Sequence, residues 1–111
     1  MSQIAADTTG WRGTNEGSKL KATSGWYYDI GNGTNDFCFT ALPGGQGMDH
    51  AIYDGYYTLM DDSGLWWTAT ERIIPDYPGL KWRRTMSHHQ TEIYRTSSEK
   101  HWRYSVRCVK D

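Results

Sequence analysis

Long apolar runs are missing from this sequence, and aliphatic side chains are scarce. A membrane-spanning helix needs about 18 consecutive apolar residues, and no stretch of this chain approaches that length. Residues 1–10 also lack the basic start and apolar middle of a signal peptide. We therefore expect no direct insertion of this chain into a membrane. The 111 residues predict a single domain with a small core, because a domain of this size buries about two-thirds of its unfolded surface.

An excess of charge of either sign is also absent. Twelve Lys and Arg residues stand against 13 Asp and Glu residues, which leaves a formal net charge of −1. The overall field of such a chain attracts neither nucleic acid nor anionic lipid, since both are polyanions. We therefore expect no nucleic-acid partner.

Cysteine is represented only by Cys38 and Cys108. The two thiols could form one disulfide in an oxidising compartment. Each stands between apolar neighbours in a strand-like stretch, however, and unpaired cysteine is among the most buried residue types. Buried free thiols are therefore the favoured interpretation, and a disulfide is the alternative.

Aromatic residues are abundant: the chain has six Trp, eight Tyr and two Phe. Residues 64–71 form the clearest strand pattern, in which alternation places Trp66 and Trp67 on opposite faces. Large rings with a polar edge serve both packing and recognition. This stretch is expected to offer one tryptophan to the core and one to a half-exposed surface.

Strand patterns also appear at residues 37–42, near residues 53–59 and at residues 104–110. Residues 31–36 favour a turn, and their oxygens fit a Ca²⁺ loop less well. No window of a dozen residues shows a helical period with caps, and residues 11–21 are expected to be a loop leading into an extended piece. The predicted architecture is short strands with long ordered loops.

Five blocks of sequence, in order, resemble the Fibrobacter succinogenes major paralogous domain. They are Lys-Leu-Lys-Ala-Thr-Ser-Gly-Trp at 19–26, Gly-Thr-Asn-Asp at 33–36, Phe-Thr-Ala-Leu-Pro-Gly-Gly at 39–45, Trp-Trp-Thr-Ala-Thr-Glu at 66–71 and Ser-Val-Arg-Cys-Val-Lys-Asp at 105–111. The resemblance implies an α+β fold of mainly short antiparallel strands, similar to C-type lectins and formylglycine-generating enzymes. It also implies a bacterial surface protein, often a lipoprotein, and therefore a cell-surface or extracellular location.

Two features depart from the family pattern. Family domains usually carry a long N-terminal half before the first block, so this chain resembles the C-terminal portion alone. The sheet would then keep an open edge that needs cover from a partner or a second copy. Cys38 stands where a small residue is expected.

Between the Trp block and the closing block, residues 72–103 are polar and aromatic with few aliphatic residues. If residues 80–86 form a strand, as the family order implies, Trp82 and Arg84 share one face. Trp, Tyr and Arg are enriched in binding hot spots, although Trp82 could instead be core beneath a solvated arginine. The predicted ligand-binding face comprises Trp82, Arg84, His88, His89, Tyr94 and Arg95. Replacing Arg84 or Tyr94 should then leave stability nearly unchanged.

His88 and His89 invite a zinc hypothesis, but adjacent strand residues point to opposite faces and only Glu92 lies nearby as a further ligand. A solvated loop is the favoured interpretation. No serine stands in a strained-turn motif, and the two cysteines do not form a redox motif. We therefore expect no enzyme, no metal and no cofactor.

These patterns predict a non-enzymatic ligand-binding or adhesion module of a bacterial surface protein. Its expected ligand is a glycan, a peptide or a protein. The alternative is a structural subunit that completes its fold by pairing with another chain, for example as a homo-oligomer. In either case the predicted core gathers the strand-like blocks, with Trp67, Phe39, Leu42, Val106 and Cys108 buried together.

Overall fold

Two antiparallel sheets with little helix make up the protein in a computed structural model, which describes residues 2–48 and 56–108. The helical elements are α1 (Gln3–Asp7), α2 (Glu16–Leu20) and the 3₁₀ turn η1 (Tyr27–Asp29). The strands are β1 (Gly10–Arg12), β2 (Gln46–Met48), β3 (Tyr56–Thr58), β4 (Ser63–Arg72), β5 (Leu80–Ser87), β6 (Ile93–Glu99) and β7 (Trp102–Arg103). None of the described helices is long and apolar enough to cross a membrane.

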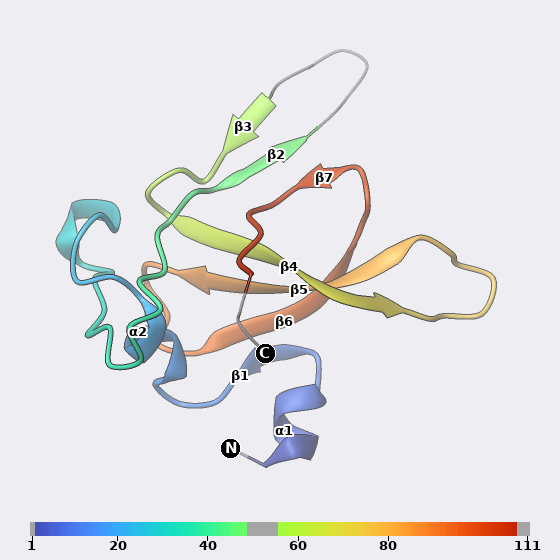
Figure 1. Ribbon diagram of the computed structural model, residues 1–111, viewed down its shortest axis with the longest axis horizontal. Coiled ribbons are helices and arrows are strands. Elements are labelled where there is room, and N and C mark those ends of the chain that lie inside the picture. Colours follow the sequence, from blue (N-terminus) through green and yellow to red (C-terminus); the bar gives the residue numbers. More distant parts are fainter. Residues whose placement is uncertain (1, 49–55, 109–111) are drawn as a thin grey trace.

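The larger sheet has the strand order β1-β6-β5-β4, with every neighbouring pair antiparallel (Figure 1). The strands predicted at 64–71 and 80–86 are confirmed as β4 and β5. β5 lies between β4 and β6, so its backbone is paired along both edges. Only the side chains of β5 therefore remain available for contacts above and below the sheet.

The smaller sheet has the order β3-β2-β7 and stands beside the N-terminal end of β4 in Figure 1. β3 confirms part of the strand expected near residues 53–59, while residue 53 lies outside the described residues. A backbone hydrogen bond from Gly45 N to Ser63 O (2.8 Å) joins the start of β2 to the start of β4. The two sheets are thus connected at one end of the longest strand.

The core centres on Trp26, which is 2% exposed and packs with Ala41 and Met86. The indole Nε1 of Trp26 donates to the carbonyl oxygen of Ala41 at 3.1 Å. The half-buried side chains of Leu20, Phe39, Trp66 and Ile93 pack around this cluster. The core therefore joins the irregular N-terminal half of the chain to the end of β5.

The predicted core is wrong in three of its five members. Leu42 is 56% exposed, Val106 is 72% exposed and Cys108 is exposed. Phe39 and Trp67 are half-buried, and Phe39 does pack on the core cluster. The error follows from treating residues 37–42 and 104–110 as strands, because neither range forms a strand over its described residues.

Residues 37–42 form a turned loop instead of the expected strand. Cys38 and Thr40 both have a φ of +55°, a left-handed conformation that breaks side-chain alternation. The side chain of Asn35 holds this turn, since its Oδ1 accepts a hydrogen bond from Thr40 N at 2.7 Å. The family block at 39–45 therefore encodes a loop, and Leu42 lies on the outside of it.

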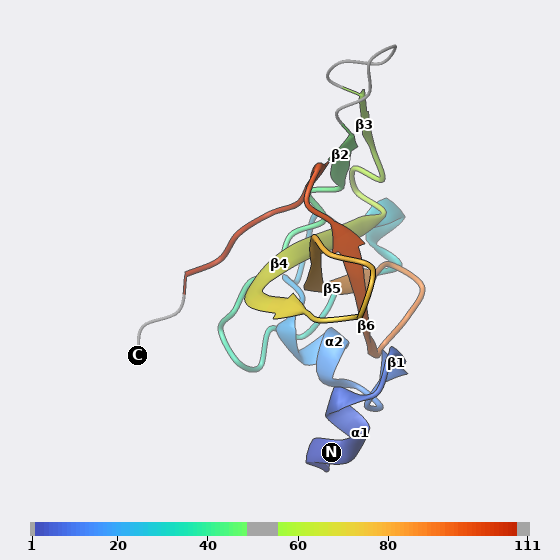
Figure 2. The ribbon, with the colours of Figure 1, turned by 90° about the vertical axis from the view of Figure 1, so that its right-hand side faces the viewer.

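Among the described residues of the segment expected as a strand at 104–110, only Ser105 forms backbone hydrogen bonds with the sheet. Ser105 N donates to Leu65 O (2.9 Å), and Trp67 N donates to Ser105 O (3.1 Å). After Ser105 the chain leaves the sheet, as Figure 2 shows for the red segment. The last residues of the predicted strand lie outside the described part. Both cysteines are free and exposed, so the expectation of buried thiols is wrong.

The absence of helix expected at residues 11–21 is also wrong, because α2 lies there. This helix of five residues is too short to show a helical period. Its position depends on Gly17, where an added Cβ would lie 2.6 Å from the carbonyl oxygen of Glu92. The position of α2 is therefore set by the close approach of Gly17 to the backbone just before β6.

Lys21 follows α2 and is 2% exposed, which is unusual for a lysine. Its Nζ donates to the carbonyl oxygens of Ser87 (2.5 Å) and Gln90 (2.7 Å) and lies 4.9 Å from the Trp26 ring centroid. Burial lowers the pKa of Lys21 to about 8, while the two carbonyls and the ring face favour the charged amine. Lys21 thus ties the N-terminal half of the chain to the β5–β6 turn.

Candidate functional site

The two faces of β5 carry different chemistry, because alternate side chains point to opposite sides of the sheet. Across β4, β5 and β6, one side presents a group that we call the arginine face: Arg72, Trp82, Arg84 and Arg95. The opposite side presents a group that we call the aromatic face: Trp11, Trp67, Arg83, Tyr94 and Tyr104.

On the arginine face, Trp82 supports two guanidinium groups. The Cζ atom of Arg95 lies 3.6 Å from the Trp82 ring centroid, and that of Arg72 lies 4.6 Å from it. Arg72 Nη1 also donates to Ser97 Oγ at 3.0 Å. Trp82 is half-buried and stacks on arginines of its own chain, so it is neither fully buried core nor a bare platform for a ligand.

Arg84 and Arg95 stand directly opposite each other in the β5–β6 register. Burial lowers the pKa of Arg84, the charge of Arg95 lowers it further, and Asp7 opposes this shift. Arg84 Nη1 donates to the Arg83 carbonyl oxygen at 3.3 Å. Arg95 Nη1 donates to the Asp7 carbonyl oxygen, while its buried Nε has no hydrogen-bond partner. Two like charges are thus held together with little to neutralise them.

No arginine of this face is paired with an acidic side chain of residues 2–48 or 56–108. The ion pairs found there join Glu71 to Lys100 (2.7 Å), Glu99 to His101 (3.3 Å) and Asp62 to His88 (3.3 Å). Asp7 acts on Arg84 without forming an ion pair, so the three arginines leave this face with net positive charge that can act on a ligand.

An apolar groove of about 410 Å³ adjoins Arg84 on the same side of the sheet. Phe39 and Trp66 form part of its wall, with their ring centroids 6.3 Å apart in an edge-to-face arrangement. Arg107 covers Phe39, with Cζ 4.7 Å from the ring centroid and Nη1 donating to the Phe39 carbonyl oxygen at 2.9 Å. The groove lining also includes Leu20, Trp67, Thr68, Ala69, Met86 and Ile93.

On the aromatic face, Arg83 is hydrogen-bonded to two neighbouring side chains and lies beside two rings. Its Nε donates to Ser98 Oγ at 2.7 Å, and its Nη1 donates to Thr85 Oγ1. Its Cζ lies 5.9 Å from the Tyr94 ring centroid and 5.4 Å from that of Tyr104. Arg83 therefore fills a packing role between two rings.

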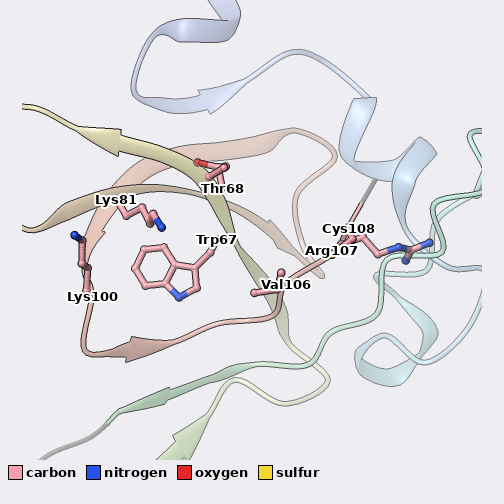
Figure 3. A pocket seen from close by; sticks show the side chains of 8 residues that line it. Trp67, Thr68, Lys81, Lys100, Val106, Arg107 and Cys108 are labelled. Atoms are coloured by element: carbon pink, nitrogen blue, oxygen red, sulfur yellow. The ribbon is translucent and has the colours of Figure 1, made fainter. Parts of the chain in front are cut away.

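A second cavity of about 600 Å³ opens where the closing segment leaves the sheet. Figure 3 shows the Trp67 ring facing it, with Lys81 and Lys100 beside the ring and Val106 across from it. The Trp67 ring also contacts Tyr104, with centroids 4.5 Å apart. This cavity owes its shape to the exposed segment that contains Val106.

The structure divides the six predicted site residues among three places. Trp82, Arg84 and Arg95 come together on the arginine face. Tyr94 lies on the opposite face, where its ring centroid is 5.1 Å from that of Trp11. The remaining two, His88 and His89, lie in the turn after β5 with their ring centroids 4.8 Å apart.

His88 is held beside Asp62 and Tyr27. Its Nδ1 lies 3.3 Å from Asp62 Oδ2 without forming a hydrogen bond, and its ring centroid is 5.1 Å from that of Tyr27. His89 Nδ1 instead lies 2.9 Å from Ser87 Oγ. Within the described ranges no three His, Cys, Asp or Glu side chains are arranged to hold a metal ion.

Side-chain amides hold the turn expected at residues 31–36. Asn32 Oδ1 accepts from Trp26 N at 3.1 Å, and its Nδ2 donates to Asp29 Oδ1 at 3.0 Å. Asn35 Nδ2 likewise donates to Thr40 Oγ1 at 3.0 Å. These amides therefore shape the loop around the core.

Sequence reasoning missed Arg72, Phe39 and Trp66 as parts of one surface. Alternation from Trp66 does place Arg72 on the same face, but the predicted strand ended one residue earlier. The register shift between Trp67 and Glu71, which brings Arg72 opposite Leu80, has no signal in the sequence. Phe39 reaches the groove from a loop that was expected to be a strand.

The architecture defines the protein as a small domain of two mainly antiparallel sheets with little helix. The model of the Fibrobacter succinogenes major domain matches residues 1–110, so the chain belongs to this family. That match begins before the first of the recognised sequence blocks. Neither the curated proteins nor the solved structures contain a match to the chain.

Proposed function

We propose that this protein is a non-enzymatic ligand-binding or adhesion module of a bacterial surface protein, with a fold related to C-type lectins. Its binding site is the arginine face together with the adjoining groove. The observation that carries this proposal is a set of arginines without acidic partners, held by Trp82 next to an apolar hollow. Glycans, peptides and proteins all present groups that such a surface can bind.

The arginine face keeps interactions that are unfavourable for folding. Like charges directly opposite each other across strands destabilise a sheet, and a buried donor without an acceptor costs free energy. Arg84 and Arg95 show the first feature, and Arg95 Nε shows the second. A bound anion would offset the repulsion between the two arginines, so this region is better suited to binding than to stabilising the fold.

An array of glycans, peptides and proteins tests this function with the wild-type chain and Arg84→Gln. Lys81→Gln is a matched control, because it removes the same charge from the same strand on the opposite face. We expect the wild type and the control to bind a common set of ligands, and Arg84→Gln to lose them. Identical profiles for all three proteins would place binding elsewhere.

A structural subunit is the second candidate, and the closing segment supports it. Val106 is 72% exposed, and it lies beside a cavity where the segment separates from β4. Apolar side chains in such a position favour pairing with another chain or a homo-oligomer. Light scattering on the eluted protein separates the two candidates, since a subunit forms an oligomer and an independent binding module runs as a monomer.

A further inference from the structure

The arginine face has three properties that together describe a ligand. Its arginines form no ion pair with described carboxylates, the guanidinium groups of Arg72 and Arg95 are held in place, and it borders an aromatic groove. Each property constrains a different part of the ligand.

The charge requires an oxyanion. Arg84 and Arg95 face each other across the β5–β6 pair, and Arg95 Nε is buried without an acceptor. A carboxylate between the two side chains would relieve their repulsion and accept hydrogen bonds from the terminal N–H groups of the guanidinium groups. Guanidinium groups bind planar carboxylates through two parallel hydrogen bonds, which a lysine cannot do.

The support beneath the arginines reduces the entropy lost on binding. Arg95 stacks on Trp82 with a Cζ-to-centroid distance of 3.6 Å, and Arg72 is held by both Trp82 and Ser97. Side chains that are already ordered lose less conformational freedom when a ligand binds. The guanidinium group of Arg95 is thus largely in position before an anion arrives.

The groove beside Arg84 accommodates the rest of the ligand. Its volume of about 410 Å³ falls in the usual range of about 300 to 1,000 Å³ for small-molecule sites, and Phe39 and Trp66 line it. Aromatic rings pack against the apolar faces of sugar rings and against other apolar groups. Arg107 adds a further cation at the groove wall.

The backbone around this site favours a saccharide over an extended peptide. Peptides that bind sheets form main-chain hydrogen bonds along an open strand edge. β5 lies between two strands, so next to Trp82 and Arg84 it offers a ligand its side chains and no open strand edge. A carboxylate-bearing sugar needs no main-chain pairing.

We propose, on the basis of the binding function inferred above, that the ligand is an acidic saccharide whose carboxylate binds Arg84 and Arg95. An adjacent sugar ring occupies the groove lined by Phe39 and Trp66. Arg72 and Trp82 act as positioning residues that hold the site in shape.

The test is isothermal titration of the full chain with trigalacturonic acid, with the uncharged galactotriose and with hexaglutamate. We expect trigalacturonic acid to bind at least about tenfold more tightly than either comparison ligand. Arg84→Gln should weaken that binding by about 10- to 100-fold, because a hydrogen bond to a charged group contributes that much. Arg84→Lys should recover only part of the loss, and Lys81→Gln should bind as the wild type does.

Thermal melts of every variant check folding, and Arg72→Gln, with an expected weakening of several-fold, is the second variant if Arg84→Gln does not fold. Equal binding of galactotriose, or of hexaglutamate, would overturn the acidic-saccharide assignment. If the array shows a neutral ligand that Arg84→Gln loses, the binding function stands and the acidic saccharide fails. If the wild type binds no array ligand and no titrated ligand, both proposals fail.

Discussion

Arg83 and Arg84 are neighbours in the chain and differ in almost every physical respect. Arg83 lies on the aromatic face, where it bonds to Ser98 and Thr85 and lies between two tyrosine rings. Arg84 lies on the arginine face beside Arg95, with a single long hydrogen bond to a carbonyl. The alternation of β5 thus places Arg83 among hydrogen-bond partners and aromatic rings, and places Arg84 beside a second cation where an anion could bind.

This contrast shows how one strand can serve stability and recognition together. Removing a side chain whose hydrogen bonds are formed leaves its partners without bonds, so the free energy of unfolding decreases. Removing one of two opposed cations costs folding little, because it also removes their repulsion. The two faces of the sheet should therefore separate in mutational experiments.

The largest expected effect concerns the core on which both faces depend. Trp26→Ala should lower the free energy of unfolding by about 3 to 5 kcal/mol, because it empties the centre of the buried cluster and removes the bond to Ala41. Urea denaturation followed by circular dichroism measures the loss. Trp67→Ala is the comparison and should cost less, since Trp67 is half-buried and borders a cavity. A larger cost for Trp67 would restore it as the core tryptophan.

The next largest loss of stability is expected on the aromatic face. Tyr94 packs on Trp11 with ring centroids 5.1 Å apart, so Tyr94→Ala should lower stability by about 2 kcal/mol. This revises the sequence-based expectation that Tyr94 can be replaced without cost. Tyr94→Phe keeps the ring and should melt near the wild-type temperature in calorimetry. If a folded Tyr94→Phe variant lost ligand binding, the binding site would have to include both faces of the sheet.

A direct test of the contrast replaces each arginine by glutamine. Arg83→Gln should lower the free energy of unfolding by about 1 kcal/mol, because it removes its bonds to Ser98 and Thr85. Arg84→Gln should change it by no more than about 0.5 kcal/mol in either direction. Chemical denaturation of the two variants in parallel measures both. The contrast between the faces would break if Arg84→Gln proved the more destabilising of the pair.

The last expected effect is a pH dependence from Lys21, a buried cation for comparison with the half-buried arginines of the sheet. Burial lowers the pKa of Lys21 to about 8 in the folded chain, while a lysine in an unfolded chain has a pKa of about 10.4. The unfolded chain therefore holds more protons between these values, so this residue makes stability rise with pH from about 8 to 10.4.

Tyrosines titrate in the same range, and hydrogen bonding to Glu99 raises the pKa of Tyr77. Lys21→Met is therefore the reference, because it keeps every other group. The wild type should gain stability relative to Lys21→Met as the pH rises, as measured by denaturation at several pH values. A constant difference between the two proteins would mean that folding leaves the pKa of Lys21 unchanged.

Much of the larger sheet could be predicted, since strands with regular alternation carry their own signal. Residues 64–71 and 80–86 alternate clearly, and they became β4 and β5. The sharing of one face by Trp82 and Arg84 followed from the same rule. The five family blocks led to the correct family, although two of those blocks were given the wrong backbone form.

The sequence alone thus determined the family, the two long strands and the arginines available for a site. Tertiary structure decided which side chains meet. Positive φ angles at Cys38 and Thr40 turned an alternating stretch into a loop, and this brought Phe39 to the groove. Cross-strand register placed Arg95 opposite Arg84 and sent Tyr94 to the other face. Register and loop closure depend on contacts between distant residues, and local patterns carry no record of those contacts.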